Sequence, residues 1–231
     1  MENIGIILAS GKGSRFGESF PKQFFEIAGK SVLEHTIDAF EESKYIDSII
    51  LVIPAGFREH VKNILSKCNY KKINKVLDGG ETRKDSVRIA IDSIEDEEAN
   101  VLIHDGVRPF VSDDIISRCI EALEKHNAIT VAIPVTDTII KVNVEKNIEN
   151  VIDRKKIYRC QTPQCFKLSL IRKAHELAAG DENFTDDCGI VLKYNLSDVY
   201  IVDGDENNIK ITYKSDIYFA EKLFQIRNVA K

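Results

Sequence analysis

Long apolar runs, basic clusters and paired cysteines are all lacking in this sequence of 231 residues. No segment approaches the roughly 20 continuous apolar residues that cross a bilayer, and the start, Met1-Glu2-Asn3-Ile4, lacks the basic residues and apolar stretch of a secretion signal. The 32 Lys and Arg are outnumbered by 37 Asp and Glu and form no basic run, so a nucleic-acid-binding face is not indicated. We therefore expect a cytoplasmic protein that binds neither a membrane nor a nucleic acid.

Cysteine, proline and glycine are also scarce. The five cysteines are odd in number, and no two form the C-x2-C pair of a zinc site, so we expect free thiols with mostly structural roles. With 5 prolines and 12 glycines, the chain shows no linker, repeat or low-complexity tract. A chain of this length with 43% apolar residues can bury a substantial core without crosslinks. Residues 1–231 are therefore predicted to form one domain.

What the sequence does contain is a regular alternation of apolar strands with amphipathic helices. The predicted strands are 3–9, 46–54, 73–77 and 100–104, and the helices between them are 32–40, 57–67 and 84–94. Because strand, helix and strand in this rhythm require right-handed crossovers, the pattern predicts an α/β fold with a mostly parallel twisted sheet.

From Ala128 onward the rhythm changes, because β-rich segments follow one another without a crossover helix. We interpret 129–134 as the last core strand and about 135–160 as a protruding β-arm. The remaining elements predicted are a strand at 199–203 and helices at 168–179, 186–193 and 216–227, the last capped by Ser215.

The glycine-rich segment after the first strand has the features of a phosphate-binding loop. An open parallel sheet forms its ligand crevice at the carboxyl ends of its strands. Gly11 and Gly13 would let backbone N–H groups approach an anion, and Arg15 would add positive charge. A tight turn without a ligand explains this loop equally well when it is taken alone. Lys22 follows closely and can fold back over the same anion.

Two later segments also follow strands. Asp78 to Ser86 contains a Gly-Gly turn against which a flat base can pack, with Ser86 hydrogen-bonding to the edge of the base. Alternatively, Ser86 and Asp85 only cap the N-terminus of the helix that follows. Asp105 directly follows the 100–104 strand and is well placed to hold Mg²⁺, while Arg108 can bind a second phosphate through its guanidinium. We expect a structural role for His104, since no Ser/His/Asp arrangement is present.

These segments, taken together and in order, resemble the polyol-phosphate cytidylyltransferase family over nearly the whole chain. The matching segments are Ala9–Arg15, Pro21–Gln23, Gly79–Ser86, His104–Pro109, Asp137–Thr138, Asp153–Arg154, Gln161–Phe166, Thr185–Asp187 and Asn208–Thr212. The resemblance implies a Rossmann-like nucleotidyltransferase fold with helices on both faces of the sheet. It also implies Mg²⁺-dependent transfer of CMP from CTP to a polyol phosphate, with release of pyrophosphate.

The resemblance further implies a role for each matching residue. The catalytic cations around the phosphates would be Arg15, Lys22 and Lys210. The residues implied to bind CTP are Ala9, Ser10, Gly11, Gly13, Gly80, Glu81, Ser86 and Asp105, with Asp105 also the metal ligand. The residues implied to bind the polyol phosphate are Arg108, Thr138 and Arg154. In the family the last two reach across a dimer interface, so a homodimer formed through the β-arm is expected.

One alternative acceptor stays open, and particular residues disfavour two alternative protein classes. Val151–Arg154 and Gly204–Lys210 look closer to the methylerythritol-phosphate enzymes, whereas Asp187–Leu192 and Phe219–Phe224 resemble the ribitol-phosphate enzymes, so ribitol phosphate is the alternative acceptor. A dinucleotide-dependent oxidoreductase would need an acidic residue ending its second strand, which here ends in Val52-Ile53-Pro54-Ala55. A non-catalytic nucleotide-binding domain is disfavoured because both Asp105 and Lys22 are present.

Overall fold

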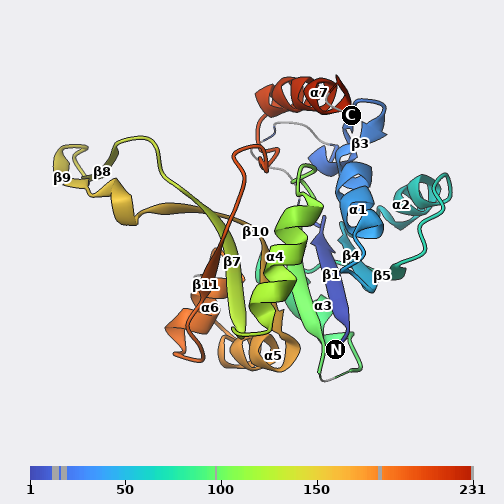
Figure 1. Cartoon of the computed structure of the whole chain (residues 1–231), viewed down its shortest axis with the longest axis horizontal. Coiled ribbons are helices and arrows are strands. Elements are labelled where there is room, and N and C mark those ends of the chain that lie inside the picture. The colour runs from blue at the N-terminus through green and yellow to red at the C-terminus, as the bar shows by residue number, and fades with distance from the viewer. Residues whose placement is uncertain (12–15, 17–19, 97, 182–183, 230–231) are drawn as a thin grey trace.

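A seven-stranded sheet forms the centre of the structure, which is a computed structural model (Figure 1). The residues described are 1–11, 16, 20–96, 98–181 and 184–229. The strand order is β11-β7-β10-β6-β1-β4-β5. In chain order the strands are β1 (Asn3–Leu8), β4 (Ser48–Ile53), β5 (Ile73–Asp78), β6 (Asn100–Asp105), β7 (Ala128–Pro134), β10 (Tyr158–Lys167) and β11 (Tyr200–Asp203).

Most neighbouring strands of this sheet run parallel, as the sequence predicts. Strand β1 pairs in parallel with β4 and β6, β4 pairs in parallel with β5, and β11 pairs in parallel with β7. Strand β10 is inserted antiparallel between β6 and β7. The carboxyl ends of β1 and β6 therefore lie side by side, and Leu8 pairs with Asp105 there.

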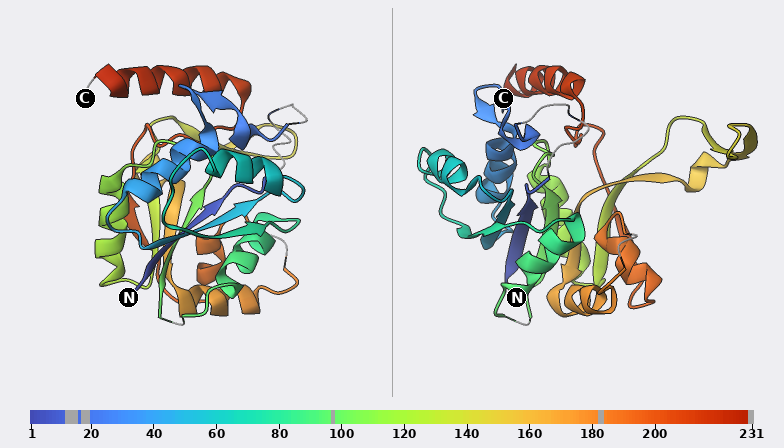
Figure 2. Two further views of the ribbon diagram at one scale, coloured as in Figure 1. Left: turned by 90° about the vertical axis from the view of Figure 1, so that its right-hand side faces the viewer. Right: turned by 180° about the vertical axis from the view of Figure 1, so that it is seen from behind.

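Helices cover both faces of the sheet (Figure 2). One apolar cluster joins the sheet to α1 (Val32–Glu42), α2 (Arg58–Leu65) and α4 (Asp113–Leu123). The cluster on the other face joins it to α3 (Arg83–Asp92), α5 (Leu168–Leu177) and α6 (Asp187–Lys193). Two-sided coverage explains why the central strands read as continuous apolar runs rather than as alternating ones.

Helix α1 shows how local sequence and packing agree. Ser31 and Glu34 form the predicted capping box, in which each side chain accepts a hydrogen bond from the other residue's backbone N–H. The buried Phe40 of this helix packs directly on Gly5 of β1, where an added Cβ would lie 2.6 Å from the ring. Glycine at this position therefore lets the helix approach the sheet closely.

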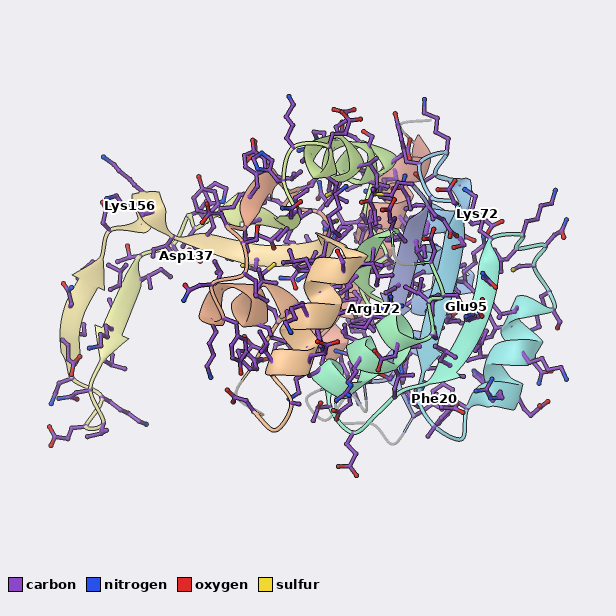
Figure 3. All side chains as sticks on the ribbon, turned by 90° about the horizontal axis from the view of Figure 1, so that it is seen from below. Phe20, Lys72, Glu95, Asp137, Lys156 and Arg172 are labelled. Carbon is purple, nitrogen blue, oxygen red and sulfur yellow. The ribbon has the colours of Figure 1, made fainter. Side chains whose placement is uncertain are left out.

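The predicted β-arm projects from the body and stands clear of it (Figures 1 and 3). It is an antiparallel hairpin of β8 (Ile139–Val142) and β9 (Ile148–Ile152), followed by the short 3-10 helix η2 (Arg154–Lys156). Apolar side chains on it are unusually exposed, with Val144 at 99% and Ile148 at 63%. Exposed apolar side chains that lie together in this way are common where proteins contact one another.

The C-terminal helix α7 (Lys214–Val229) lies beside the small hairpin of β2 (Glu26–Ile27) and β3 (Lys30–Ser31). The predicted cap at Ser215 is wrong, because Ser215 lies inside the helix. The carboxylate of Asp216 instead accepts hydrogen bonds from the backbone N–H groups of Thr212 and Tyr213, at 2.7 and 2.8 Å. An ionised carboxylate satisfies these two donors better than one hydroxyl does.

Candidate functional site

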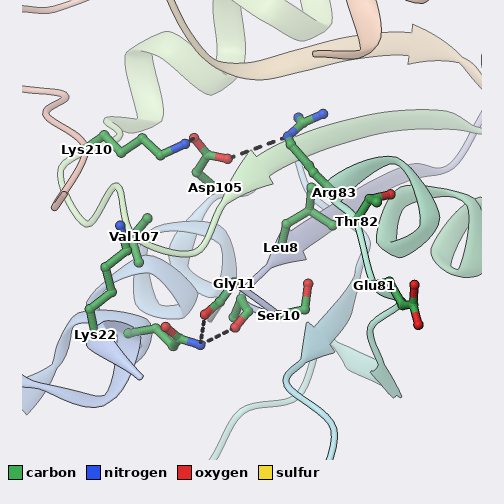
Figure 4. Close-up of a pocket in the computed structure, with 13 residues that line it drawn as sticks. Leu8, Ser10, Gly11, Lys22, Glu81, Thr82, Arg83, Asp105, Val107 and Lys210 are labelled. Atoms are coloured by element: carbon green, nitrogen blue, oxygen red, sulfur yellow. Dashed lines mark hydrogen bonds and ion pairs between the residues drawn. The ribbon is translucent and has the colours of Figure 1, made fainter. Parts of the chain in front are cut away.

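A pocket of about 240 Å³ opens at the carboxyl ends of β1 and β6 (Figure 4). The predicted site residues that line it are Ala9, Ser10, Gly11, Lys22, Gly80, Glu81, Asp105 and Lys210. They come from segments that lie far apart in the sequence, and the parallel sheet brings them to one edge. The pocket residues to which the sequence assigned no role are Leu8, Gln23, Thr82, Arg83 and Val107.

Lys22 is directed into the pocket by the residue that follows it. Lys22 begins the 3-10 helix η1 (Lys22–Phe24) and is only 8% exposed. The buried amide of Gln23 donates to the backbone carbonyls of Ala9 and Gly11, at 3.3 Å for the latter. These two bonds fix η1 against the first loop, so Lys22 lines the same pocket as Ala9, Ser10 and Gly11.

The Gly-Gly turn packs tightly against the end of β1. A Cβ added to Gly79 would lie 2.3 Å from Cβ of Ser10 and 2.9 Å from Oγ of Ser86. Ser86 Oγ donates to the carbonyl of Thr82 at 3.0 Å, so the 2.8 Å bond between the two serines is donated by Ser10. Ser86 is thus buried behind the pocket wall, and its contact with a base stays a prediction.

Helix α3 begins at this wall. Thr82 and Asp85 form a capping box, so the N-terminal role proposed for Asp85 is confirmed. The box fixes the direction of the first helical residue, Arg83, whose guanidinium then points into the pocket.

Asp105 lies at the centre of a cluster of three cations. Its carboxylate is 2.8 Å from Nζ of Lys210, 3.4 Å from Nε of Arg108 and 4.0 Å from Nε of Arg83. Burial alone would raise the pKa of Asp105, but attraction to Lys210, Arg83 and Arg108 outweighs it and lowers that pKa. The carboxylate is therefore ionised at neutral pH, and the cluster carries a net positive charge suited to an anionic ligand.

His104 has the structural role that the sequence predicts. The ring is fully buried, and Nε2 donates to the carbonyl of Arg108 at 3.1 Å, so Nδ1 is free to accept from the Thr162 hydroxyl at 3.0 Å. Thr162 Oγ1 in turn accepts from the backbone N–H of Asp105. Burial lowers the pKa of His104 to about 4, so the ring is neutral and fixes the loop that carries Asp105.

Lys210 reaches the pocket because its segment is tied to that same loop. The buried Asn208 donates to the carbonyl of Thr162, its own carbonyl accepts from Nη1 of Arg108 at 2.8 Å, and Ile211 N–H donates to the carbonyl of Val107. Lys210 also lines a second pocket of about 250 Å³, together with Arg108. Lys210 therefore lines both pockets.

Not every predicted site residue reaches these pockets. Thr138 and Arg154 lie on the exposed arm and line neither pocket, and Arg154 donates to the carbonyl of Thr136. Gly13 and Arg15 lie outside the described residues.

The donor set of the pocket fits a Mg²⁺ ion that is shared with a bound nucleotide. Mg²⁺ is usually held by one or two carboxylates together with substrate phosphates, rather than by an all-protein cage. Asp105 supplies one such carboxylate inside the pocket. Among the described residues there is no group of three or more metal-ligating side chains, so an all-protein cage is not seen in that part of the chain.

Within residues 1–11, 16, 20–96, 98–181 and 184–229, no helix is long and apolar enough to cross a bilayer.

The chain is similar to a family of nucleotidyltransferases along almost its whole length. Residues 4–226 match a family model described as 2-C-methyl-D-erythritol 4-phosphate cytidylyltransferase. A relative of that name from Thermosipho melanesiensis is 41% identical, with 94% of this chain and 95% of the relative covered. A solved structure of 4-diphosphocytidyl-2C-methyl-D-erythritol synthase from Anaerococcus prevotii superposes with a TM-score of 0.87 at 32% identity, covering 97% and 96% of the two chains.

A second type of relative is also similar over the full length of this chain. The bifunctional ribulose 5-phosphate reductase/CDP-ribitol pyrophosphorylase Bcs1 of Haemophilus influenzae is 46% identical over 232 residues, covering 98% of this chain. The chain spans 49% of the length of that relative.

Proposed function

This chain belongs to the 2-C-methyl-D-erythritol 4-phosphate cytidylyltransferase family and is therefore a nucleotidyltransferase, and on that premise we propose that it transfers CMP from CTP to a polyol phosphate. The observation that carries the proposal is the pocket at the carboxyl ends of the parallel strands, where Lys210 and Arg83 face Asp105 and Lys22 lines the same cavity. A triphosphate requires such a concentration of cations, and a flat base requires a wall such as the Gly-Gly turn.

The chemistry needs positioning and charge neutralisation rather than a general base. An oxygen of the acceptor's phosphate, already ionised at neutral pH, attacks the α-phosphorus of CTP. A new P–O bond forms while the bond to the β-phosphate oxygen breaks, and pyrophosphate leaves with that electron pair. Lys22 and Lys210 neutralise the charge that moves toward the leaving group. The buried, neutral His104 takes no part in proton transfer.

Asp105 would hold Mg²⁺ together with the phosphates of CTP. Bound there, the ion would neutralise phosphate charge and orient the triphosphate. Lys210 already faces the same carboxylate and lines this pocket, so it is in place to turn from Asp105 to the phosphates of CTP, while Arg108 is in place to turn to the acceptor's phosphate.

The second pocket is our candidate site for the acceptor. Arg108 there offers a guanidinium suited to a phosphate, and Lys210 lies between this pocket and the first. The family model and most relatives favour 2-C-methyl-D-erythritol 4-phosphate as the acceptor. The 46% identity to Bcs1, against 41% and less for those relatives, specifically favours ribitol 5-phosphate as the second candidate.

Pyrophosphate release measured with CTP, Mg²⁺ and each acceptor in turn tests the proposal. Release with only methylerythritol 4-phosphate assigns the first candidate, and release with only ribitol 5-phosphate assigns the second with the same site residues. No release with either acceptor or with other polyol phosphates would contradict the proposed transfer. An Asp105→Asn variant is the blank that corrects for contaminating activity.

We also propose that the arm completes the acceptor site of a second copy of the chain, in a cytoplasmic homodimer. The exposed apolar residues of the arm support a contact surface, and the family resemblance supports the roles of Thr138 and Arg154. CTP and polyol phosphates are metabolites of the cytoplasm, which supports that location.

Mixing two inactive variants should restore activity. Arg154→Ala removes the arm contact and Lys210→Ala removes the pocket lysine, so a mixed dimer contains one site with both residues intact. Random exchange at equal amounts should bring turnover to roughly a quarter of the wild-type value, because half of the dimers are mixed and each holds one intact site. Turnover that stays at the mean of the two separate variants would contradict a shared site.

A further inference from the structure

A buried ion pair behind the pocket has no place in the mechanism above. Asp187, the last residue of the Thr185–Asp187 segment, begins α6, and its side chain is only 1% exposed. One carboxylate oxygen lies 2.6 Å from Nη1 of Arg83, and the other accepts from Nε2 of the buried His175 at 3.0 Å. The backbone N–H of Asp187 donates to the side chain of Gln164.

Keeping a charged group so deep in the fold costs several kcal/mol in desolvation. Burial alone would raise the pKa of Asp187, but attraction to Arg83 and the hydrogen bond from His175 outweigh it, so the carboxylate stays ionised. Apolar side chains could fill this space at no such cost, and buried ion pairs are weak contributors to stability. The buried carboxylate of Asp187 therefore indicates a role beyond stability.

Arg83 is the only partner of Asp187 that also lines the nucleotide pocket, among the residues that the structure describes. Its Nη1 faces Asp187, and its Nε lies 4.0 Å from Oδ1 of Asp105 (Figure 4). Lys210 and Arg108 approach the opposite oxygen, Oδ2, of the same carboxylate. The guanidinium of Arg83 thus faces Oδ1 of Asp105, whereas Lys210 and Arg108 face Oδ2.

We propose that Asp187 and His175 are positioning residues that fix the guanidinium of Arg83, and that Arg83 in turn orients the Asp105 carboxylate for CTP binding and turnover. This role rests on the proposed function of the pocket. It explains why α6 and α3, which are about 100 residues apart in sequence, meet through their first residues. When Lys210 and Arg108 turn toward bound phosphates, Arg83 still holds Asp105 in place because Asp187 holds Arg83.

Comparison of two single variants with their charge-neutral double variant tests this inference. Arg83→Met and Asp187→Asn should each lower the melting temperature, because the first leaves Asp187 without its cation in the core and the second removes the nearer of the two carboxylates that face Arg83. Each should also lower kcat at least tenfold and leave KM for the acceptor within about twofold. The double variant should recover most of the melting temperature, since no unpaired charge remains, but none of the lost kcat.

A purely structural pair would behave differently. The double variant would then recover kcat together with melting temperature, and that result would overturn the inference. His175→Gln, which retains a donor for Asp187, should keep kcat close to wild type, whereas His175→Leu should lower it. Arg88→Ala is the matched control on α3, because its exposed pair with Asp92 lies outside the pocket.

Calorimetric titration with CTP and Mg²⁺ separates this inference from the proposed reaction. We expect Asp187→Asn to bind CTP about tenfold more weakly than wild type, and unchanged affinity would count against the positioning role. A wild-type protein that binds CTP but releases no pyrophosphate with any acceptor would overturn the proposed reaction, and the binding comparison would still decide the positioning role.

Discussion

Alanine in place of Lys22 or Lys210 should lower kcat by about a hundredfold to a thousandfold. Both ammonium groups line the pocket, and Lys210 lies 2.8 Å from the Asp105 carboxylate. In the proposed transfer each neutralises charge that develops as pyrophosphate leaves, so its removal should act mainly on the transition state rather than on substrate binding. Steady-state measurement of pyrophosphate release gives kcat and both KM values for each variant.

The folded state should survive either lysine substitution. Lys210 is partly exposed, and Lys22, although only 8% exposed, lines the pocket rather than the apolar core, so neither loss opens a cavity in that core. Lys173→Ala is the matched control, because that exposed lysine on α5 lies outside both pockets. Thermal unfolding followed by circular dichroism checks the fold, and wild-type kcat in either pocket variant would contradict the assignment of that lysine.

Asn in place of Asp105 should also lower kcat by about a hundredfold or more, for a different reason. The substitution removes the carboxylate available for Mg²⁺ and leaves Lys210, Arg108 and Arg83 without their shared counter-charge. The pocket becomes more positive but loses the carboxylate that would share Mg²⁺ with the triphosphate, so the KM for CTP in the presence of Mg²⁺ should rise. Low kcat with a weakened apparent affinity for CTP is therefore the expected combination.

The same variant should melt at a lower temperature without ligand, because three partly buried cations then repel one another. CTP should raise that melting temperature, since its phosphates replace the missing negative charge. Asp114→Asn provides the control, because it removes an exposed carboxylate paired with Arg118 on α4. A kcat for Asp105→Asn within a few-fold of wild type would rule out a central role for this carboxylate.

Regular periodicity made the parallel part of the fold predictable. Each predicted strand and helix from 3 to 104 is present, because alternating apolar strands and amphipathic helices leave few topologies open. Helix α4 was not predicted, although Ser112 caps it and Ile115, Ile116, Cys119 and Leu123 form its buried face, so the signal was present in the sequence.

Strand β10 illustrates a real limit. Its central segment, Gln161-Thr162-Pro163-Gln164, is polar and contains proline, a composition that argues against a central strand. The strand is stable there because its buried polar groups find partners from distant segments, such as Thr162 with His104 and Gln164 with Asp187. These hydrogen bonds depend on tertiary contacts, which the hydrophobic periodicity of the sequence cannot reveal.

The candidate site was predictable to the same degree. Residues at or just beyond a strand's carboxyl end, such as Gly11 and Asp105, could be assigned to one edge of a parallel sheet from chain order alone. Arg83 stands within the matching Gly79–Ser86 segment, but its function depends on a partner about 100 residues later and could not be read from spacing. The structure adds that connection and leaves Arg15 and Gly13 as predictions.

The most direct test of the proposed transfer follows the phosphorus atoms of CTP. Purified protein is incubated with Mg²⁺, a polyol phosphate and CTP labelled at either the α- or the γ-phosphate. We predict that the α label moves into a CDP-polyol while the γ label leaves as pyrophosphate, in equal amounts. Release of the γ label as free phosphate, or an α label that ends in CMP or CDP rather than in a polyol product, would contradict this reaction.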